Sequence, residues 1–158
     1  MIGSVPMTPE GLERLKEERK RLISVERPKN VKDIQTAREH GDISENAEFD
    51  AAKDRQGIIN ARLKDIENAI ASAQVIDPAK VRSERIVFGA TVKVIDINTD
   101  EELTYQIVGP FEFDVALNRI SVHSPLARAL IGKTEGDDVK VQTPNGLREL
   151  EIIEVKYC

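Results

Sequence analysis

Five acidic side chains crowd one short stretch of the sequence, REHGDISENAEFD at residues 38–50, and no lysine or arginine lies between Arg38 and Lys53. Within this stretch Asp42 and Glu45 are three residues apart. Carboxylate oxygens are the ligands that Mg²⁺ prefers, but the ion is usually held by one or two carboxylates together with waters and substrate phosphates. The pair could therefore complete a metal site only in another molecule, where it would orient a water against a phosphodiester.

Capping is the alternative role for the same residues. Asp-x-x-Glu is also a capping-box pattern, in which Asp42 would cap a helix and Glu45 would lie in its first turn, and Ser44 is a competing cap. On spacing alone, capping is the better-supported interpretation. His40 is the one imidazole nearby and a minor candidate for chemistry. We expect the flanking acids to be solvated surface residues: Glu39, Glu48 and Asp50.

The composition indicates a soluble chain with a modest core. It has 158 residues, 40% of them hydrophobic and 32% charged, and a net charge of −5. This acidity argues against a protein that holds duplex DNA by neutralising many phosphates. Cys158 is the only cysteine, so no disulfide framework is possible, and no apolar run is long enough to span a membrane. We expect a cytoplasmic protein that is a monomer when free and has no membrane partner.

Residues 8–73 have the composition of two long helices. Thr8 is expected to cap the first, with Pro9 at its first position, and Pro28 predicts a kink within residues 24–28. The apolar positions of the first helix are Leu12, Leu15, Leu22, Val31, Ile34 and Ala37. Those of the second alternate in steps of three and four, which is typical of a coiled-coil seam: Phe49, Ala52, Gln56, Ile59, Leu63, Ile66, Ile70 and Ala73. A tight turn at Gly41 would make the two helices antiparallel.

After residue 76 the apolar pattern changes to the alternation typical of strands. Strands are expected at residues 86–97, 103–108, 120–123, 138–142 and 147–157. A short helix is expected at 125–131, with Ser124 as its cap and Gly132 as its stop. The sequence therefore predicts a hairpin within residues 1–76 with its acidic tip at 39–50, a linker at 77–83, and a small antiparallel α+β domain at 84–158.

Four separated motifs in this order resemble the bacterial Gre transcript cleavage factors, most closely their A type. They are MTPEGLERLKEE, AREHGDISENAEFDAAKDRQG, AQVID and SPLARALIGKTEGDDV. The resemblance implies an N-terminal antiparallel two-helix coiled coil and a C-terminal domain like the FK506-binding proteins (FKBP-like). It also implies a function, in which the coiled coil enters the secondary channel of RNA polymerase and stimulates the polymerase's intrinsic, Mg-dependent cleavage of backtracked RNA, which rescues arrested complexes.

The resemblance also implies which residues act. The family's tip pair, in its GD-x-x-EN context, falls on Asp42 and Glu45, which would act in trans on a Mg²⁺ shared with the polymerase; the chain would have no cofactor of its own and would not be an enzyme. This favours the catalytic role over capping alone, although both can hold. Candidate contacts to the nascent RNA 3′ end are Arg14, Lys16, Arg19, Lys20 and Arg21, of which at most two or three can share one face. Candidate polymerase-docking residues are Ser124, Pro125, Arg128 and Lys133.

Three alternatives stay open. A Gre-like factor of the same architecture could inhibit the polymerase from its secondary channel, although the intact Asp42 and Glu45 pair favours cleavage. An FKBP-type prolyl isomerase would need an aromatic-lined pocket, and the second domain has few aromatics and no tryptophan. A structural adaptor would bind the polymerase without changing its products. The modest basic character, eight basic against three acidic residues at 14–32, and the net charge of −5 favour the A type over the B type.

Overall fold

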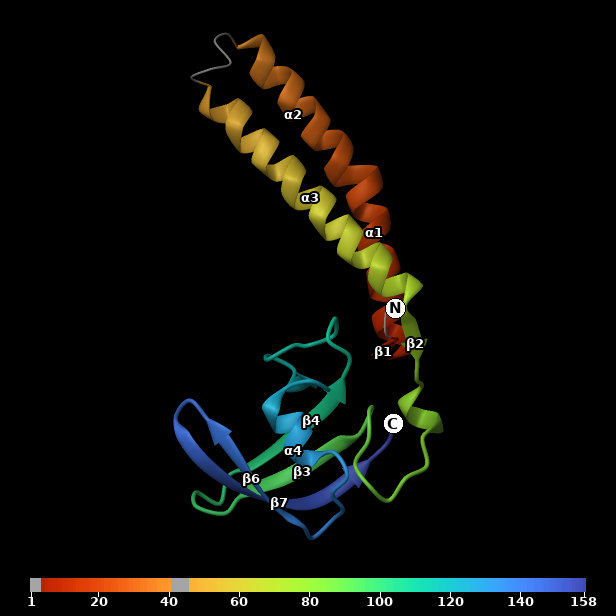
Figure 1. Ribbon diagram of the computed structural model, residues 1–158, viewed down its shortest axis with the longest axis vertical. Coiled ribbons are helices and arrows are strands. Elements are labelled where there is room, and N and C mark those ends of the chain that lie inside the picture. Colours follow the sequence, from red (N-terminus) through yellow and green to blue (C-terminus); the bar gives the residue numbers. More distant parts are fainter. Residues whose placement is uncertain (1–3, 41–45) are drawn as a thin grey trace. The chain divides into compact units, whose positions relative to one another are not determined.

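The computed structural model describes residues 4–40 and 46–158, and these form two compact units, which are considered separately. One unit is Glu13–Ser72, the body of the helical hairpin, and the other combines Met1–Leu12 with Ala73–Cys158 (Figure 1). The strands that flank the hairpin in sequence thus belong to the sheet unit. The functional division into residues 1–76, 77–83 and 84–158 stays a prediction.

The hairpin consists of α1 (Pro9–Arg21), a π-helical turn (Leu22–Glu26), α2 (Arg27–Glu39) and α3 (Ala47–Ala71). Thr8 caps the first helix as predicted, because its Oγ1 accepts a hydrogen bond of 3.1 Å from the Gly11 amide. Bonds between the helices join residue 18 to 62, 30 to 52 and 37 to 46. One number rises as the other falls, so the two arms run antiparallel.

The irregularity expected before Pro28 is the π-helical turn, through which the helix continues. Pro28 has no amide hydrogen to donate to the carbonyl four residues earlier, and the Arg27 amide instead bonds to Leu22 O, five residues back. The turn adds one residue to the period, so the buried positions after Leu22 become Asn30, Ile34 and Ala37. The prediction for Val31 was wrong, since its side chain is 44% exposed and Asn30 takes the inward position.

The buried stripe of α3 follows the predicted spacing. Its fully buried members are Ala52, Ile59, Leu63, Ile66 and also Ala69, which the pattern did not include. Phe49, Gln56 and Ile70 are half-buried beside them. The cap of this helix was predicted wrongly: it is Asn46, not Asp42 or Ser44, and its extended backbone immediately precedes Ala47.

The main sheet has five strands in the order β5-β4-β3-β7-β6. They are β3 (Thr91–Asp96), β4 (Glu102–Val108), β5 (Arg119–Ser121), β6 (Asp138–Thr143) and β7 (Gly146–Lys156). The sheet is mixed, not antiparallel as predicted, because β4 and β5 run parallel. The connection at residues 109–118 carries the chain back to Gln106, so that residues 119–121 pair with residues 106–108 in the same direction. Residues 86–90, expected in the first strand, lie outside it, and residues 88 and 89 form a turn in which Gly89 has φ 91°.

A short helix, α4 (Pro125–Leu130), packs on this sheet. Ala127 and Leu130 are fully buried against the core, and Leu126 and Ile131 are partly buried there, as the pattern predicted. The core beneath them consists of Ile86, Ala90, Val92, Val94, Ile107, Val139, Val141, Leu150 and Ile152. A separate parallel pair joins β1 (Val5–Met7) to β2 (Ala73–Val75), and a 3-10 turn (Pro78–Lys80) follows.

Candidate functional site

The candidate site is the segment that connects α2 to α3. The two predicted catalytic residues, Asp42 and Glu45, lie outside the described residues, as does Ser44. The structure describes the two ends that hold this segment: α2 ends at Glu39, with His40 as its C-cap, and α3 begins at Ala47. The site can therefore be built from these two helix ends.

Asn46 ties the two helix ends together. Its Oδ1 accepts a 3.1 Å hydrogen bond from the Phe49 amide, and its Nδ2 donates a 2.6 Å bond to Ala37 O in the last turn of α2. One side chain thus caps the second helix and crosses to the first. Asn46 directly follows Glu45 in the chain.

Sequence reasoning missed this role of Asn46. Asparagine is among the best N-cap residues, and Asn46 lies three residues before Phe49, the first member of the buried stripe. The capping-box pattern predicts Asp42 as the cap instead. The available signal was therefore the position of the asparagine relative to the helical periodicity.

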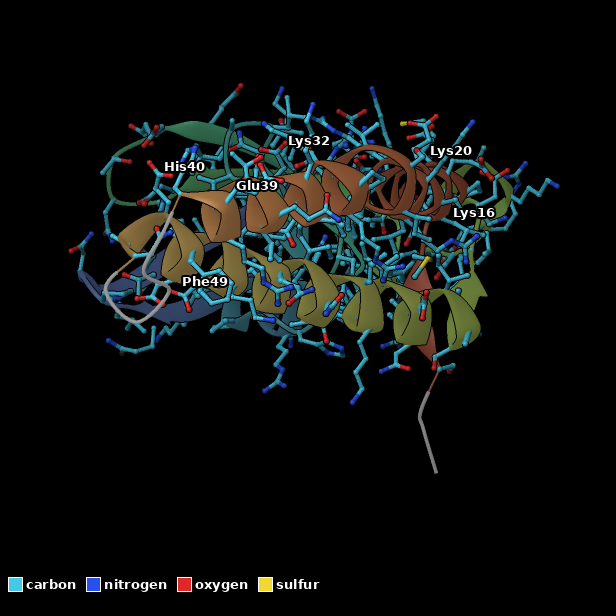
Figure 2. The ribbon with its side chains drawn as sticks, turned by 90° about the horizontal axis from the view of Figure 1, so that it is seen from above. Lys16, Lys20, Lys32, Glu39, His40 and Phe49 are labelled. Carbon is cyan, nitrogen blue, oxygen red and sulfur yellow. The ribbon has the colours of Figure 1, made fainter. Side chains whose placement is uncertain are left out.

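The side chains beside the tip are exposed and partly paired. His40 Nδ1 lies 3.3 Å from Glu48 Oε2 across the two helix ends, with side chains 59% and 72% exposed. The Arg38 guanidinium lies 5.7 Å from the centre of the Phe49 ring. Glu48 and Asp50 fall in the first turn of α3, where the helix dipole favours negative charge. Figure 2 shows Glu39 and His40 at the end of one helix and Phe49 on the other.

The five basic candidates all lie in the helical α1. Lys16 has Arg19 three residues and Lys20 four residues further along as neighbours on the helix surface, and Figure 2 labels Lys16 and Lys20. Arg14 and Arg21 lie seven residues apart on another face. Lys16 lies 3.8 Å from Glu13, and Arg21 lies 3.5 Å from Glu26. The helix therefore divides the five candidates into a group of three and a pair, and does not gather them in one patch.

An ion pair joins the two helices in this basic stretch. Arg62 Nε and Nη2 donate to the two carboxylate oxygens of Glu18 at 2.6 and 2.8 Å. These hydrogen bonds hold the pKa of Glu18 below its ordinary value, and in return they raise the pKa of Arg62. Glu18 is thus charged and paired with Arg62, whereas Lys16 lies beside Glu13 on the same helix.

The docking candidates lie in α4 or close to its ends in sequence. The Ser124 hydroxyl accepts a 3.2 Å hydrogen bond from the Ala127 amide, so it serves as the helix cap, as predicted. Pro125, Arg128 and Lys133 are exposed. These three therefore remain available to a partner, while Ser124 positions the helix that carries two of them.

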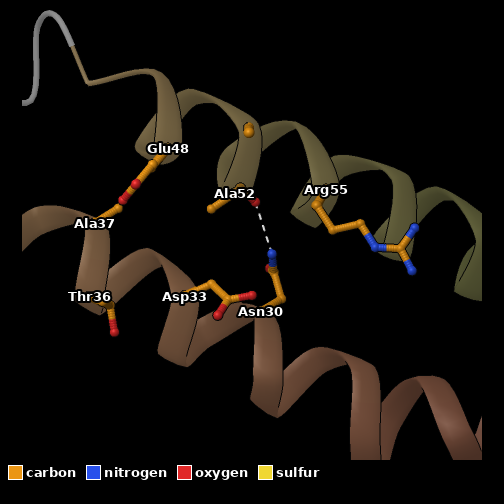
Figure 3. Close-up of a pocket in the computed structure, with 8 residues that line it drawn as sticks. Asn30, Asp33, Thr36, Ala37, Glu48, Ala52 and Arg55 are labelled. Atoms are coloured by element: carbon orange, nitrogen blue, oxygen red, sulfur yellow. Dashed lines mark hydrogen bonds between the residues drawn. The ribbon is translucent and has the colours of Figure 1, made fainter.

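A groove of about 400 Å³ lies between α2 and α3 (Figure 3). It is lined by Asn30, Asp33, Thr36, Ala37, Glu48, Ala51, Ala52 and Arg55. The small alanine side chains leave the space, and Asn30 Nδ2 donates a 2.9 Å hydrogen bond to Ala52 O. The walls of the groove carry two carboxylates and a guanidinium, so the groove is polar and contains charges of both signs.

Residues 4–40 and 46–158 contain no group of three or more His, Cys, Asp or Glu side chains that could hold a metal ion. Nor does any helix in this part of the chain have the apolar length needed to span a bilayer.

Both parts of the chain match known family models. Residues 5–75 match "Transcription elongation factor, N-terminal", and residues 81–157 match "Transcription elongation factor, GreA/GreB, C-term". The chain is similar over 99% of its length to proteins named transcription elongation factor GreA, with 99% of each relative covered. The identities are 52% for that of Syntrophotalea carbinolica, 51% for Alkalilimnicola ehrlichii and 54% for Jannaschia sp..

Among solved structures, the chain matches the GreA factor homolog 1 (Gfh1) protein of Thermus thermophilus at 29% identity. The match covers 96% of this chain and 98% of that one, with a TM-score of 0.44. The two family models and the full-length relatives assign the sequence as a whole, including the hairpin and the sheet unit. The chain belongs to the GreA/GreB family of transcription elongation factors.

Proposed function

We propose that this chain is a transcription elongation factor that stimulates RNA polymerase to cleave backtracked RNA and so rescues arrested complexes. The observation that carries the proposal is the full-length family match of a chain whose Asp42 and Glu45 pair is intact at the hairpin connection. The chain performs no catalysis alone. It acts in the cytoplasm on a protein partner, and it is the A type of the family.

The hairpin is the part that would reach the polymerase active site. We propose that it is an antiparallel coiled coil that enters the secondary channel, and that the FKBP-like sheet unit docks outside through Pro125, Arg128 and Lys133. The cap and cross-link made by Asn46 support this role, because a catalytic pair works best on a segment whose ends are held.

The donor set at the tip fits a shared metal ion. Asp42 and Glu45 provide carboxylate oxygens, which suit Mg²⁺, but two carboxylates leave most of its six coordination positions to other ligands. The polymerase, RNA phosphates and waters would supply those positions. When bound there, the ion would neutralise developing charge and lower the pKa of a bound water. The chain's own part is to bring two carboxylates to that place and hold their direction.

The basic face of α1 is proposed to contact the extruded RNA. Lys16 and Lys20 lie one turn apart on one face of the helix. Glu18, between them in sequence, faces α3 and pairs with Arg62. Phosphate contacts by two lysines would give binding that weakens as salt increases. Arg14 and Arg21 form the second, opposed candidate pair.

The decisive experiment uses a halted, backtracked elongation complex with radiolabelled RNA and Mg²⁺. We expect the wild-type chain to release short 3′ RNA fragments, and Asp42→Ala with Glu45→Ala to abolish release while binding to the polymerase is largely retained. Glu39→Ala with Asp50→Ala is the matched control, because it removes the same charge from exposed flanking positions. Cleavage that survives the first double change would overturn the tip assignment.

The same assay separates the rival functions. A channel inhibitor would slow elongation without releasing fragments, and a structural adaptor would bind without altering the products. A prolyl isomerase would show turnover on a proline peptide.

A further inference from the structure

The loop between β4 and β5 carries four exposed apolar side chains at alternate positions, which we call the apolar loop. Phe111 is 37% exposed, Phe113 57%, Val115 71% and Leu117 59%. At about 150–200 Å² per fully exposed side chain, they offer roughly 400 Å² of apolar surface. Single exposed apolar residues are ordinary, but a concentration of this size commonly marks an interaction site. Figure 1 shows the loop beyond the end of β4.

Hydrogen bonds hold the outer half of the apolar loop in one conformation. Asp114 and Arg119 exchange two backbone bonds of 3.0 and 2.9 Å, and the Asn118 amide donates to Val115 O at 3.1 Å. The Asp114 carboxylate also accepts from the Ala116 amide at 3.0 Å. Asn118 adopts φ 53°, a left-handed conformation that asparagine tolerates. Val115 and Leu117 therefore lie in a closed turn and cannot simply fold back onto the core.

Glu112 keeps the inner half of the apolar loop in place. Its carboxylate is buried and accepts bonds from the Thr8 amide at 3.1 Å, the Gly109 amide at 3.0 Å and the Thr8 hydroxyl. Phe111 and Phe113, on either side of it, are both exposed. Anchoring Glu112 inward thus holds the two rings outward. An ordered display of apolar groups incurs an unfavourable hydration free energy in the free protein, which a bound partner would relieve.

We propose that the apolar loop docks against an apolar strip on the surface of RNA polymerase, beside the contact made by α4. This inference rests on the proposed function, since it assumes that the polymerase is the partner. The loop leads through β5 directly to Ser124 and α4, and the Val122 amide donates a 2.8 Å bond to Val108 O, the residue before the loop. The loop and the docking helix therefore start from the same edge of the sheet.

Size favours the polymerase over a second copy of the chain. Stable complexes bury about 800 Å² on each partner, roughly twice what the apolar loop offers. Such a surface is too small to hold a dimer alone, but it strengthens a complex that other contacts already hold. A lipid surface is a poorer fit, because residues 109–118 contain no lysine or arginine and the chain carries a net charge of −5.

The test measures polymerase binding by the full-length chain labelled at Cys158, its exposed free cysteine. Val115→Ser with Leu117→Ser, and separately Phe113→Ser, are compared with Leu147→Ser, an equally apolar control that is 53% exposed on β7. Fluorescence anisotropy is expected to give a Kd about tenfold higher for the loop variants and less than twofold higher for the control. Thermal unfolding of each variant checks that the fold is intact, and cleavage at saturating protein should persist.

Each other outcome has a distinct meaning. Unchanged affinity in folded loop variants overturns the inference while leaving the proposed function standing. A wild-type chain that does not bind polymerase, or binds without cleavage, overturns the proposed function instead. Sedimentation that finds a wild-type dimer lost in Val115→Ser with Leu117→Ser would assign the loop to a second copy. Binding to phosphatidylglycerol vesicles that the variants lose would assign it to lipid, and either result rejects the polymerase as occupant.

Discussion

The hairpin and the sheet unit are stabilised by different arrangements of contacts. In the hairpin, each helix contributes one stripe of buried residues. The hydrogen bonds between the helices lie along its length and join residues that are 9, 22 and 44 positions apart in sequence. In the sheet unit the core is closed on itself, and a single hydrogen bond joins Tyr157 to Arg85, 72 residues away. The hairpin can therefore form progressively from its tip, where loop closure is least costly, whereas the sheet unit must form as a whole.

This difference makes core truncation the most damaging change, and its location should decide which unit unfolds. Leu150→Ala is expected to destabilise the sheet unit by about 3 kcal/mol, and Leu63→Ala should destabilise the hairpin by a similar or smaller amount, because two helices can close a gap more easily. Both tyrosines, Tyr105 and Tyr157, lie in the sheet unit, so their fluorescence reports it, while ellipticity at 222 nm mainly reports the helices. If both signals shift together for both variants, the two units unfold as one.

Asn46→Ala should have the next largest effect, and it should be local to the hairpin. It removes the cap of α3 and the bond to Ala37 O, which together are expected to contribute about 1–2 kcal/mol. We expect a lower urea midpoint at 222 nm, an unchanged tyrosine transition and weaker transcript cleavage. Asn60→Ala, at an exposed position of the same helix, is the control. Equal effects at the two positions would contradict a special role for the cap.

Substitutions of Asn30 should show how much its buried side chain contributes to the stability of the hairpin. Its side chain is 4% exposed, and its acceptor, Ala52 O, keeps a helical bond of its own. Asn30→Leu is therefore expected to change stability by no more than about 1 kcal/mol, in the stabilising direction, because an apolar group replaces a buried amide. Asn30→Ala should destabilise by leaving a gap. A large loss of stability in the leucine variant would show that the hydrogen bond itself is essential.

The smallest effect is expected from the ion pair between Glu18 and Arg62, and it should depend on pH. The pKa of Glu18 lies below its ordinary value of 4.5 in the folded state. Its contribution is therefore complete above pH 4.5 and disappears as the pH falls through the lowered pKa. Because both side chains are about 40% exposed, it should be about 0.5 kcal/mol.

The measurement is a comparison of wild type with Glu18→Gln by urea unfolding between pH 7 and pH 3. The difference in unfolding free energy should shrink toward acid. Lys64→Gln provides a control at an exposed lysine of α3. A difference that grows toward acid would contradict the direction of the pKa shift.

The sequence predicted the helices and their buried faces well because a long stripe repeats one rule many times. The spacing from Phe49 to Ile70 needed no knowledge of the partner helix. The same reasoning failed at Val31, because the period itself changed in the π-helical turn, and it failed at the helix cap, because Asp42, Ser44 and Asn46 are all competent residues. Choosing among them requires the position of Ala37 O, which only the folded hairpin supplies.

The sheet was harder to predict because strand pairing is not local. Alternation located β3, β4, β6 and β7, but nothing in residues 119–121 indicates that β5 runs parallel to β4. Glu112 was likewise missed, since a glutamate in a loop reads as a solvated residue until its three donors are assembled around it. The tip pair, Asp42 and Glu45, was assigned by resemblance, and its role stays a prediction.

The π-helical turn at Leu22–Glu26 has a consequence for how this arm can change in length. Leu15 and Leu22 lie seven residues apart, and an unbroken α-helix would next turn Lys29 and Thr36 inward. The additional residue replaces them with Asn30 and Ala37. We therefore expect a natural or engineered deletion of one residue in this turn to keep the same side chains on the inward face, while Pro28 still interrupts the hydrogen bonds of the helix. Within the described residues of the hairpin, this turn is a position where the deletion of a single codon leaves the buried side chains unchanged.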